Sequence, residues 1–180
     1  MTERAAGDVE SEALGLAAVP CLPELLDAVV RLLPFARDAA FSFLDLGSGS
    51  GVLAATLLMH FVNARAVLLE ESAGLRSAAT QRLAQFADRI EIAPIAFARE
   101  PLPRGFGAVV TLFGLHGVED IARRGVYREV YGALQPEGAF LAAEWIRPPT
   151  HGIASLYADI HTREGRVGGA SKGEIGRAHV

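Results

Sequence analysis

Short apolar segments recur along the chain, separated by stretches in which apolar residues follow a helical spacing. Because these segments are short and mostly uninterrupted by polar residues, each is predicted to be a buried strand. They are Phe41–Leu46, Arg65–Glu70, Arg89–Ile95, Ala108–Phe113 and Ala139–Trp145. Continuous apolar strands, as opposed to alternating ones, are typical of a parallel sheet covered on both faces.

The stretches between the strands predict helices on the spacing of their apolar residues. They are Pro23–Leu33, Val52–Phe61, Ala73–Phe86 and Asp120–Leu134, with one more amphipathic helix around Ile153–Ile160. Strands that alternate with helices in this way predict an α/β protein built on a doubly wound parallel sheet of about five strands.

The loop after the first predicted strand is rich in glycine. Gly47, Gly49 and Gly51 alternate with serines directly after Asp45 and Leu46. Without Cβ atoms, this backbone can turn sharply and lie against a ligand. Doubly wound folds bind their ligands at the carboxyl edge of the sheet, where this loop is expected to lie. The spacing is G-x-G-x-G, and Val52 stands where a dinucleotide fingerprint needs its last glycine, which disfavours an NAD-dependent oxidoreductase.

A carboxylate at the end of the second strand would complete such a site. In nucleotide-binding sheets an acid about 20 residues after the glycines accepts ribose hydroxyls. Glu70 ends the second predicted strand at that spacing, and Glu71 follows it. The alternative for both residues, and the favoured one for Glu71, is an ordinary acid at the start of a helix.

Taken together, these segments resemble a known family. "LDLGSGSG" followed by "LLEESAGLRSAAT" is similar to the class I S-adenosylmethionine-dependent methyltransferases, especially small stand-alone bacterial ones. "GAVVTLFGLHGVED" and "YREVYGALQPEGAFLAAEW" resemble the fourth strand of that family and the stretch leading into its fifth strand. The resemblance covers roughly residues 19–145. It implies a Rossmann-like fold, S-adenosyl-L-methionine as cofactor, and methyl transfer to a small-molecule acceptor.

The resemblance also assigns cofactor-binding residues. It places the end of the first strand and the glycine loop around the amino-acid part of the cofactor. It places the two acids at the end of the second strand around the ribose. The segment after the third strand would contact adenine, and the end of the fourth strand would pass near the methionyl group. The residues are Asp45, Gly47, Ser48, Gly49, Gly51, Glu70, Glu71, Ala96, Phe97, Thr111 and Leu112.

Three positions depart from the pattern of the family. Ala96 stands where an adenine-contacting aspartate is common, Gly107 stands where an aspartate often precedes the fourth strand, and Glu137–Gly138 replaces a double glycine. The first departure leaves an alternative open, namely a methyltransferase-like protein that binds the cofactor with little or no catalysis.

No catalytic residue follows from the motifs, and two weak candidates stand at strand ends. His116 follows the fourth predicted strand, and an imidazole can act as a general base near neutral pH. Glu144 lies near the end of the fifth strand and could orient an acceptor amine or hydroxyl. Both residues also have a purely structural interpretation. No histidine has a spacing typical of a metal site.

Charge and cysteine content narrow the class of partner. The net charge of −4 and the isoelectric point of about 5.7 give no basic surface for a nucleic acid. Cys21 is the single cysteine, so no intrachain disulfide can form, as is typical of a reducing cytoplasm. No signal peptide or membrane span is predicted, and the sequence does not define an oligomeric state.

The ends of the chain are predicted to differ from the domain between them. Residues 1–12 are predicted to be a flexible N-terminus and residues 13–174 a methyltransferase domain that is incomplete. Residues 175–180, "IGRAHV", equal the translation of a common sequencing adaptor and are predicted to be a non-native tail. On this interpretation the gene is truncated near Glu174, and the sixth and seventh strands usual in the family are missing.

Overall fold

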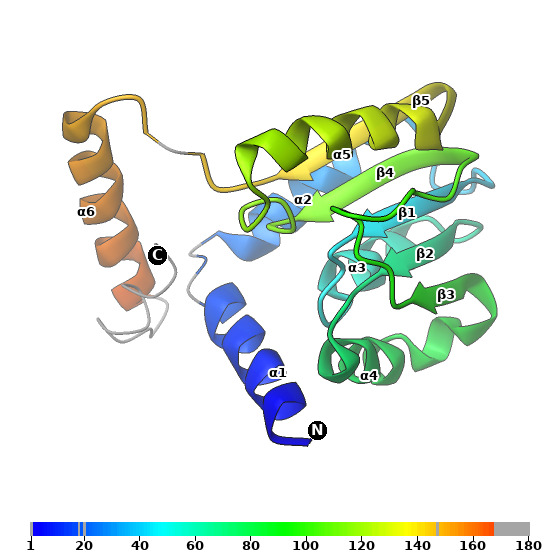
Figure 1. The fold of residues 1–180 in the computed structure, drawn as a ribbon, viewed down its shortest axis with the longest axis horizontal. Helices are drawn as coiled ribbons and strands as arrows, with labels where there is room; N and C mark the ends of the chain where they lie inside the picture. Colours follow the sequence, from blue (N-terminus) through cyan, green and yellow to red (C-terminus); the bar gives the residue numbers. More distant parts are fainter. Residues whose placement is uncertain (1, 18, 20, 147, 168–180) are drawn as a thin grey trace.

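A computed structural model describes residues 2–17, 19, 21–146 and 148–167. Its centre is a five-stranded, all-parallel sheet in the order β3-β2-β1-β4-β5 (Figure 1). The strands are β1 (Ser42–Leu46), β2 (Arg65–Leu69), β3 (Ile90–Ala93), β4 (Phe106–Leu112) and β5 (Leu134–Ala143). The predicted doubly wound, Rossmann-like sheet is confirmed, and all five carboxyl ends meet at one edge.

Successive side chains of each strand enter two different cores. Phe43 of β1 and Val110 of β4 face a core formed with α2 (Leu22–Leu32), α3 (Val52–His60) and α4 (Ala73–Arg82). Leu44 follows Phe43, and Val109 precedes Val110. Both face a second core, which is formed with α5 (Asp120–Ala133). Covering both faces explains why the inner strands β1, β2 and β4 are mostly apolar.

Among the strands and the helices that cover the sheet, the largest differences from the predicted bounds are at the end of α4 and the start of β5. The helix predicted to reach Phe86 stops at Arg82, and a 3-10 segment, η1 (Ala84–Arg89), continues the chain. Strand β5 begins at Leu134, earlier than the predicted Ala139, because Leu134 already pairs with Phe106 of β4. A register shift then carries the pairing to Ala108 and Ala139. Pro136 and Gly138, residue types that disfavour a helix, lie between Leu134 and Ala139, within this irregularity.

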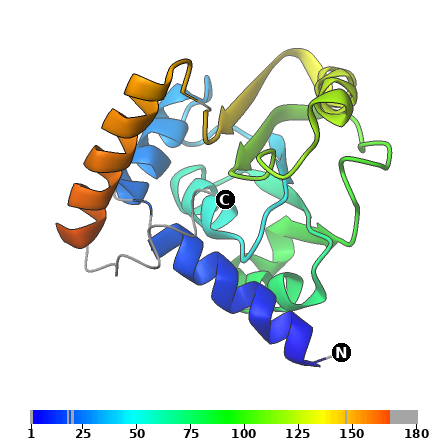
Figure 2. The same cartoon turned by 60° about the vertical axis from the view of Figure 1, so that its left-hand side comes forward.

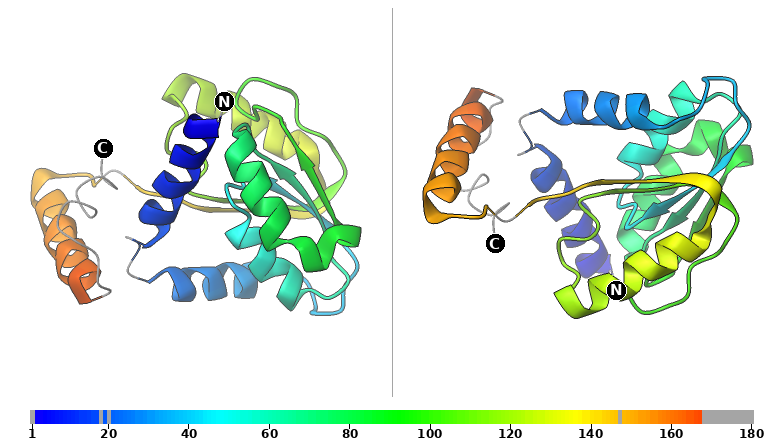
Figure 3. Two further views of the ribbon diagram at one scale, coloured as in Figure 1. Left: turned by 90° about the horizontal axis from the view of Figure 1, so that it is seen from below. Right: turned by 90° about the horizontal axis from the view of Figure 1, so that it is seen from above.

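The N-terminus forms a helix where a flexible segment is predicted. Helix α1 (Thr2–Ala17) lies across the carboxyl edge of the sheet and packs against α4, as Figure 2 shows. Helix α6 (His151–Val167) stands beyond α1, away from the sheet (Figure 3). Of the apolar side chains that predict α6, Leu156, Tyr157 and Ile160 are exposed and Ile153 is half-buried.

The C-terminal tail and the absence of a membrane span are two further predictions from the sequence. The proposed tail, residues 175–180, lies outside the described residues. Within the described ranges, no individual helix has the length and apolarity to cross a membrane. A bent pair, Gly7–Ala17 with Leu22–Leu32, meets those criteria by length and composition.

Candidate functional site

The glycine loop after β1 has the backbone conformation that its sequence predicts. Gly47, Gly49 and Gly51 all have positive φ angles, of 61°, 55° and 78°. A side chain strains a residue in this left-handed region, so glycine is strongly favoured at each of the three turns. Gly51 then caps the N-terminus of α3, and the Ser48 amide donates to the Leu69 carbonyl at the end of β2. The loop therefore joins the ends of β1 and β2 at the carboxyl edge.

A buried carboxylate lies beneath this loop. Asp45 is 1% exposed, and neither of its carboxylate oxygens has a hydrogen-bond partner among the described residues. Burial raises the pKa of the Asp45 carboxyl from 3.8 to about 8, and the negative charge of Glu70 adds to the shift. A buried polar group without a partner is costly, so this arrangement points to a cationic or hydrogen-bonding ligand. The Ser48 hydroxyl in the loop is likewise buried and has no hydrogen-bond partner in the part of the chain that the structure describes.

Glu70 connects the loop to the start of α4. One carboxylate oxygen accepts from the Gly49 amide at 3.0 Å, and the other accepts from the Ser72 amide at 2.8 Å. Each oxygen keeps a second lone pair for a further donor. The two interpretations of Glu70 are therefore compatible, because the acid beside the helix start is also the acid that contacts the glycine loop.

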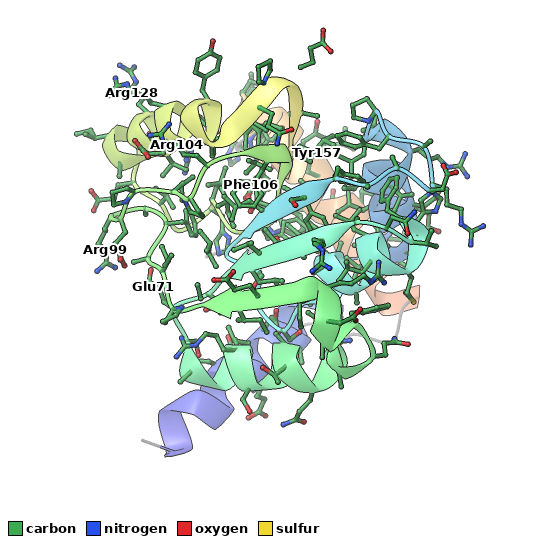
Figure 4. All side chains as sticks on the ribbon, turned by 90° about the vertical axis from the view of Figure 1, so that its right-hand side faces the viewer. Glu71, Arg99, Arg104, Phe106, Arg128 and Tyr157 are labelled. Atoms are coloured by element: carbon green, nitrogen blue, oxygen red, sulfur yellow. The ribbon has the colours of Figure 1, made fainter. Side chains whose placement is uncertain are left out.

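A cavity of about 460 Å³ opens beside these residues. Two predicted cofactor residues, Glu71 and Phe97, line it, together with Ala98, Arg99, Gly114, Gly117, Val118, Glu119 and Ala122. The Arg99 guanidinium lies 3.9 Å from the Glu71 carboxylate, and Figure 4 shows both side chains at the carboxyl ends of β2 and β3. None of the described residues lining the cavity belongs to the glycine loop. The site thus has an open part and a covered part.

Three further predicted cofactor residues, Thr111, Leu112 and Ala96, do not line the cavity. The Thr111 hydroxyl is buried, donates to the Leu46 carbonyl and accepts from the Gly114 amide. Leu112 packs in the core shared with α3. The Ala96 amide donates to the Glu100 carboxylate at 2.9 Å and closes a turn. Through its bond to the Gly114 amide, Thr111 supports a residue that lines the cavity.

Gly114 is a site residue that the sequence does not single out. A Cβ atom there would lie 2.5 Å from both the Leu46 carbonyl oxygen and the Thr111 hydroxyl. The loop after β4 can approach β1 this closely only with glycine at that position.

The two weak catalytic candidates come together around this loop. One oxygen of Glu144 accepts from the Leu115 amide at 2.8 Å. Burial raises the pKa of the Glu144 carboxyl, although the Leu115 hydrogen bond, the nearby charges of His116 and Arg123, and a Gly114 hydrogen bond oppose the rise. His116 and Glu144, 28 residues apart in sequence, therefore share one environment.

The bond of His116 defines its tautomer. Its Nδ1 lies within hydrogen-bond distance of the Phe113 carbonyl oxygen, which can only accept. Nδ1 therefore carries a hydrogen, and whenever the ring is neutral Nε2 has a lone pair that can accept a proton. Phe113 itself has a φ of 57°, which is rare for a bulky residue, and its ring stacks on Trp145 at 5.3 Å. Unusual backbone of this kind tends to occur at functional sites.

Comparison with known proteins agrees with this arrangement. Residues 43–138 match a family described as a methyltransferase domain. Over 125 residues the chain is 30% identical to a "Ribosomal RNA small subunit methyltransferase H" of Synechococcus sp. (strain CC9311), covering 69% of this chain and 40% of that protein. The chain thus spans about 40% of the length of the curated relatives it matches.

Two solved structures illustrate the structural likeness. The glycopeptide N-methyltransferase MtfA, crystallised with S-adenosyl-L-methionine, is 27% identical, with a TM-score of 0.55 over 66% of this chain and 52% of that one. An O-methyltransferase family protein from Burkholderia thailandensis is 20% identical, with a TM-score of 0.68 over 90% and 50%. The second likeness shows the fold. Since the family match covers more than half of the chain, this chain belongs to the methyltransferase-domain family, in its class I fold.

Proposed function

We propose that this chain binds S-adenosyl-L-methionine and transfers its methyl group to a small-molecule acceptor. The observation that carries the proposal is the buried carboxylate of Asp45, which has no partner among the described residues and lies beneath a left-handed glycine loop. The cofactor carries an ammonium group, and a buried carboxylate is a strong partner for such a cation.

The other residues fit the rest of the cofactor. Glu70 keeps lone pairs that can accept ribose hydroxyls, in addition to its two backbone bonds. The Phe97 ring lines the cavity and offers an apolar surface for adenine, which compensates for the absence of an aspartate at Ala96. Glu71 and Arg99, which form an ion pair at the rim, would border this part of the site.

When bound, the cofactor supplies an activated methyl group on a sulfonium. The chain then has to position the acceptor and exclude water. We assign the positioning to the loop after β4, which Glu144 fixes through the Leu115 amide and Arg123 through the Leu115 and Val118 carbonyls. His116 Nε2 would accept a proton from an acceptor hydroxyl, whereas a neutral amine would attack through its own lone pair.

Charge favours a small molecule over a ribosomal RNA as the acceptor. The net charge of −4 would repel a phosphate backbone, although the curated relatives carry a ribosomal RNA methyltransferase name. The alternative of a cofactor-binding protein with little or no turnover remains an outcome of the same experiment.

The test has two steps. Calorimetry with S-adenosylhomocysteine first measures cofactor binding, which we expect. Incubation with methyl-labelled S-adenosylmethionine then compares a metabolite collection with small ribosomal subunits. Label on a metabolite supports the proposal, label on ribosomal RNA contradicts the acceptor class, and binding with no labelled product supports the alternative.

The role of Glu70 predicts a loss of affinity on truncation. Glu70→Ala is expected to weaken binding of S-adenosylhomocysteine by roughly tenfold to a hundredfold, because it removes a charge-assisted contact on the order of 1.5–3 kcal/mol. Glu71→Ala, at the exposed rim, should have a smaller effect in the same calorimetric titration. A larger effect of Glu71→Ala would mean that the ribose acid is assigned to the wrong residue.

The role of His116 predicts a loss of turnover with little change in cofactor affinity. With a hydroxyl acceptor from the screen, His116→Ala should lower kcat by about a hundredfold, within the range for a positioned general base. His60→Ala, an exposed histidine at the far end of α3, is the matched control and should retain full turnover. Equal kcat values for the two variants would remove His116 from the mechanism.

A further inference from the structure

Helix α1 places an acidic side chain on the glycine loop. Glu12 Oε1 accepts a hydrogen bond from the Ser50 amide at 2.7 Å. The same oxygen occupies the space into which a Cβ atom on Gly49 would project. The bare backbone of Gly49 is therefore in contact with a carboxylate from the N-terminal helix.

A second acidic residue anchors α1 one helical turn away. Asp8 Oδ2 accepts from the Ser72 hydroxyl at 2.6 Å, and Asp8 and Glu12 share one face of α1 because they are four residues apart. Ser72 caps the N-terminus of α4, and Ser50 directly precedes the Gly51 cap of α3. Both carboxylates thus lie at helix N-termini, where negative charge is favourable.

These contacts cover the part of the site that the proposed cofactor needs. Ser48, Gly49, Ser50 and Gly51 are buried, and the open cavity lies on the side of Glu71 and Phe97. The amino-acid part of S-adenosylmethionine ends in a carboxylate, the same group that Glu12 presents to the Ser50 amide. One amide hydrogen cannot bind both carboxylates well at the same time.

We propose that α1 is an autoinhibitory gate in which Glu12 occupies the place of the cofactor carboxylate. The inference rests on the proposed cofactor. In the closed state the adenosine side of the site is open and the glycine loop is blocked. Cofactor binding requires Glu12 to leave the Ser50 amide, so the measured affinity is lower than that of the open state in proportion to the open fraction.

The test compares Glu12→Gln with Glu10→Gln in the complete chain. Glu10 is an exposed acid on the same helix, so its variant removes the same charge without touching the loop. The probe is S-adenosylhomocysteine, which has no net charge, so long-range electrostatics should affect the two variants little. Glu12→Gln should bind about three- to tenfold more tightly than Glu10→Gln, because the charge-assisted hydrogen bond of the closed state becomes a weaker, neutral one.

The kinetics provide a second measurement. Stopped-flow binding should show that Glu12→Gln raises the association rate, because the gate opens more often. Weaker binding or faster dissociation would show that Glu12 is a cofactor ligand, and affinities equal to those of Glu10→Gln would show that the contact has no influence. Either result overturns the gate while leaving the proposed function intact. If neither wild type nor variant binds the probe, the proposed function itself fails, and the gate fails with it.

Discussion

Gly49→Val is expected to abolish detectable cofactor binding while the domain still folds. Gly49 has a φ of 55°, and its missing side chain leaves the space that Glu12 now enters. Since Glu12 reaches this space with the end of a flexible side chain, it can move aside. A bound cofactor lying on the Gly49 backbone cannot. Backbone strain of about 1–3 kcal/mol adds to the steric effect, and calorimetry with S-adenosylhomocysteine measures the result.

Gly105→Val separates the two contributions. Gly105 has a φ of 93°, yet a Cβ atom there would meet nothing within 4 Å. Both variants should therefore lose a similar amount of stability in chemical denaturation, and only Gly49→Val should lose binding. If Gly105→Val weakens binding equally, global strain is responsible and the loop does not contact the cofactor.

The central sheet could be predicted because its inner strands β1, β2 and β4 carry apolar residues on both faces. Phe43 and Leu44 are adjacent in β1 and enter different cores. The run of apolar residues therefore indicates a buried strand without any knowledge of the segments that pack against it. The glycine loop is equally visible, because three left-handed residues in one turn can hardly be anything but glycine.

Other elements depend on contacts between distant parts of the chain. Helix α1 lacks a strong apolar stripe, and the contacts that hold it, from Asp8 and Glu12, reach Ser72 and Ser50. No local pattern reveals such pairs. The early start of β5 likewise depends on Leu134 pairing with Phe106 across the sheet, against the local signal of Pro136 and Gly138.

Some residues of the candidate site could likewise be predicted from the local sequence, whereas others depend on contacts between distant parts of the chain. Asp45, the glycines and Glu70 follow a recognisable spacing, and the structure brings them together around one loop. Thr111 and Ala96 lie near the expected strand ends, but their hydrogen bonds are made within the protein and neither residue lines the cavity. The approach of Glu144 to the loop of His116 depends on β4 and β5 being neighbours, which is a property of the sheet order.

Asp45→Asn should change stability and cofactor affinity in opposite directions. The folded protein holds the Asp45 proton up to a pKa of about 8, whereas the unfolded chain releases it near 3.8. Between these values the folded state binds more protons, so the free energy of unfolding falls as pH rises through this window. At pH 7 the cost of this carboxyl approaches about 4 kcal/mol at most, since each pKa unit corresponds to about 1.36 kcal/mol.

The neutral variant removes that cost. Thermal unfolding of Asp45→Asn should therefore occur at a higher temperature than that of wild type at pH 8, with little difference near pH 4. Asp38→Asn, at an exposed position, is the control for simple loss of a charge and should follow wild type.

The affinity for the cofactor should rise with pH, whereas the free energy of unfolding falls. The cofactor ammonium pairs with ionised Asp45, so wild-type affinity should rise from pH 6 to pH 8, and binding should release a proton into the buffer. In Asp45→Asn this rise should disappear, and affinity at pH 8 should fall by roughly tenfold to a hundredfold. Unfolding curves that are parallel across pH for both proteins would show that Asp45 is ionised in the free fold. A variant that is more stable at pH 8 but binds as tightly as wild type would show that the cost of the buried carboxylate is unconnected with the cofactor.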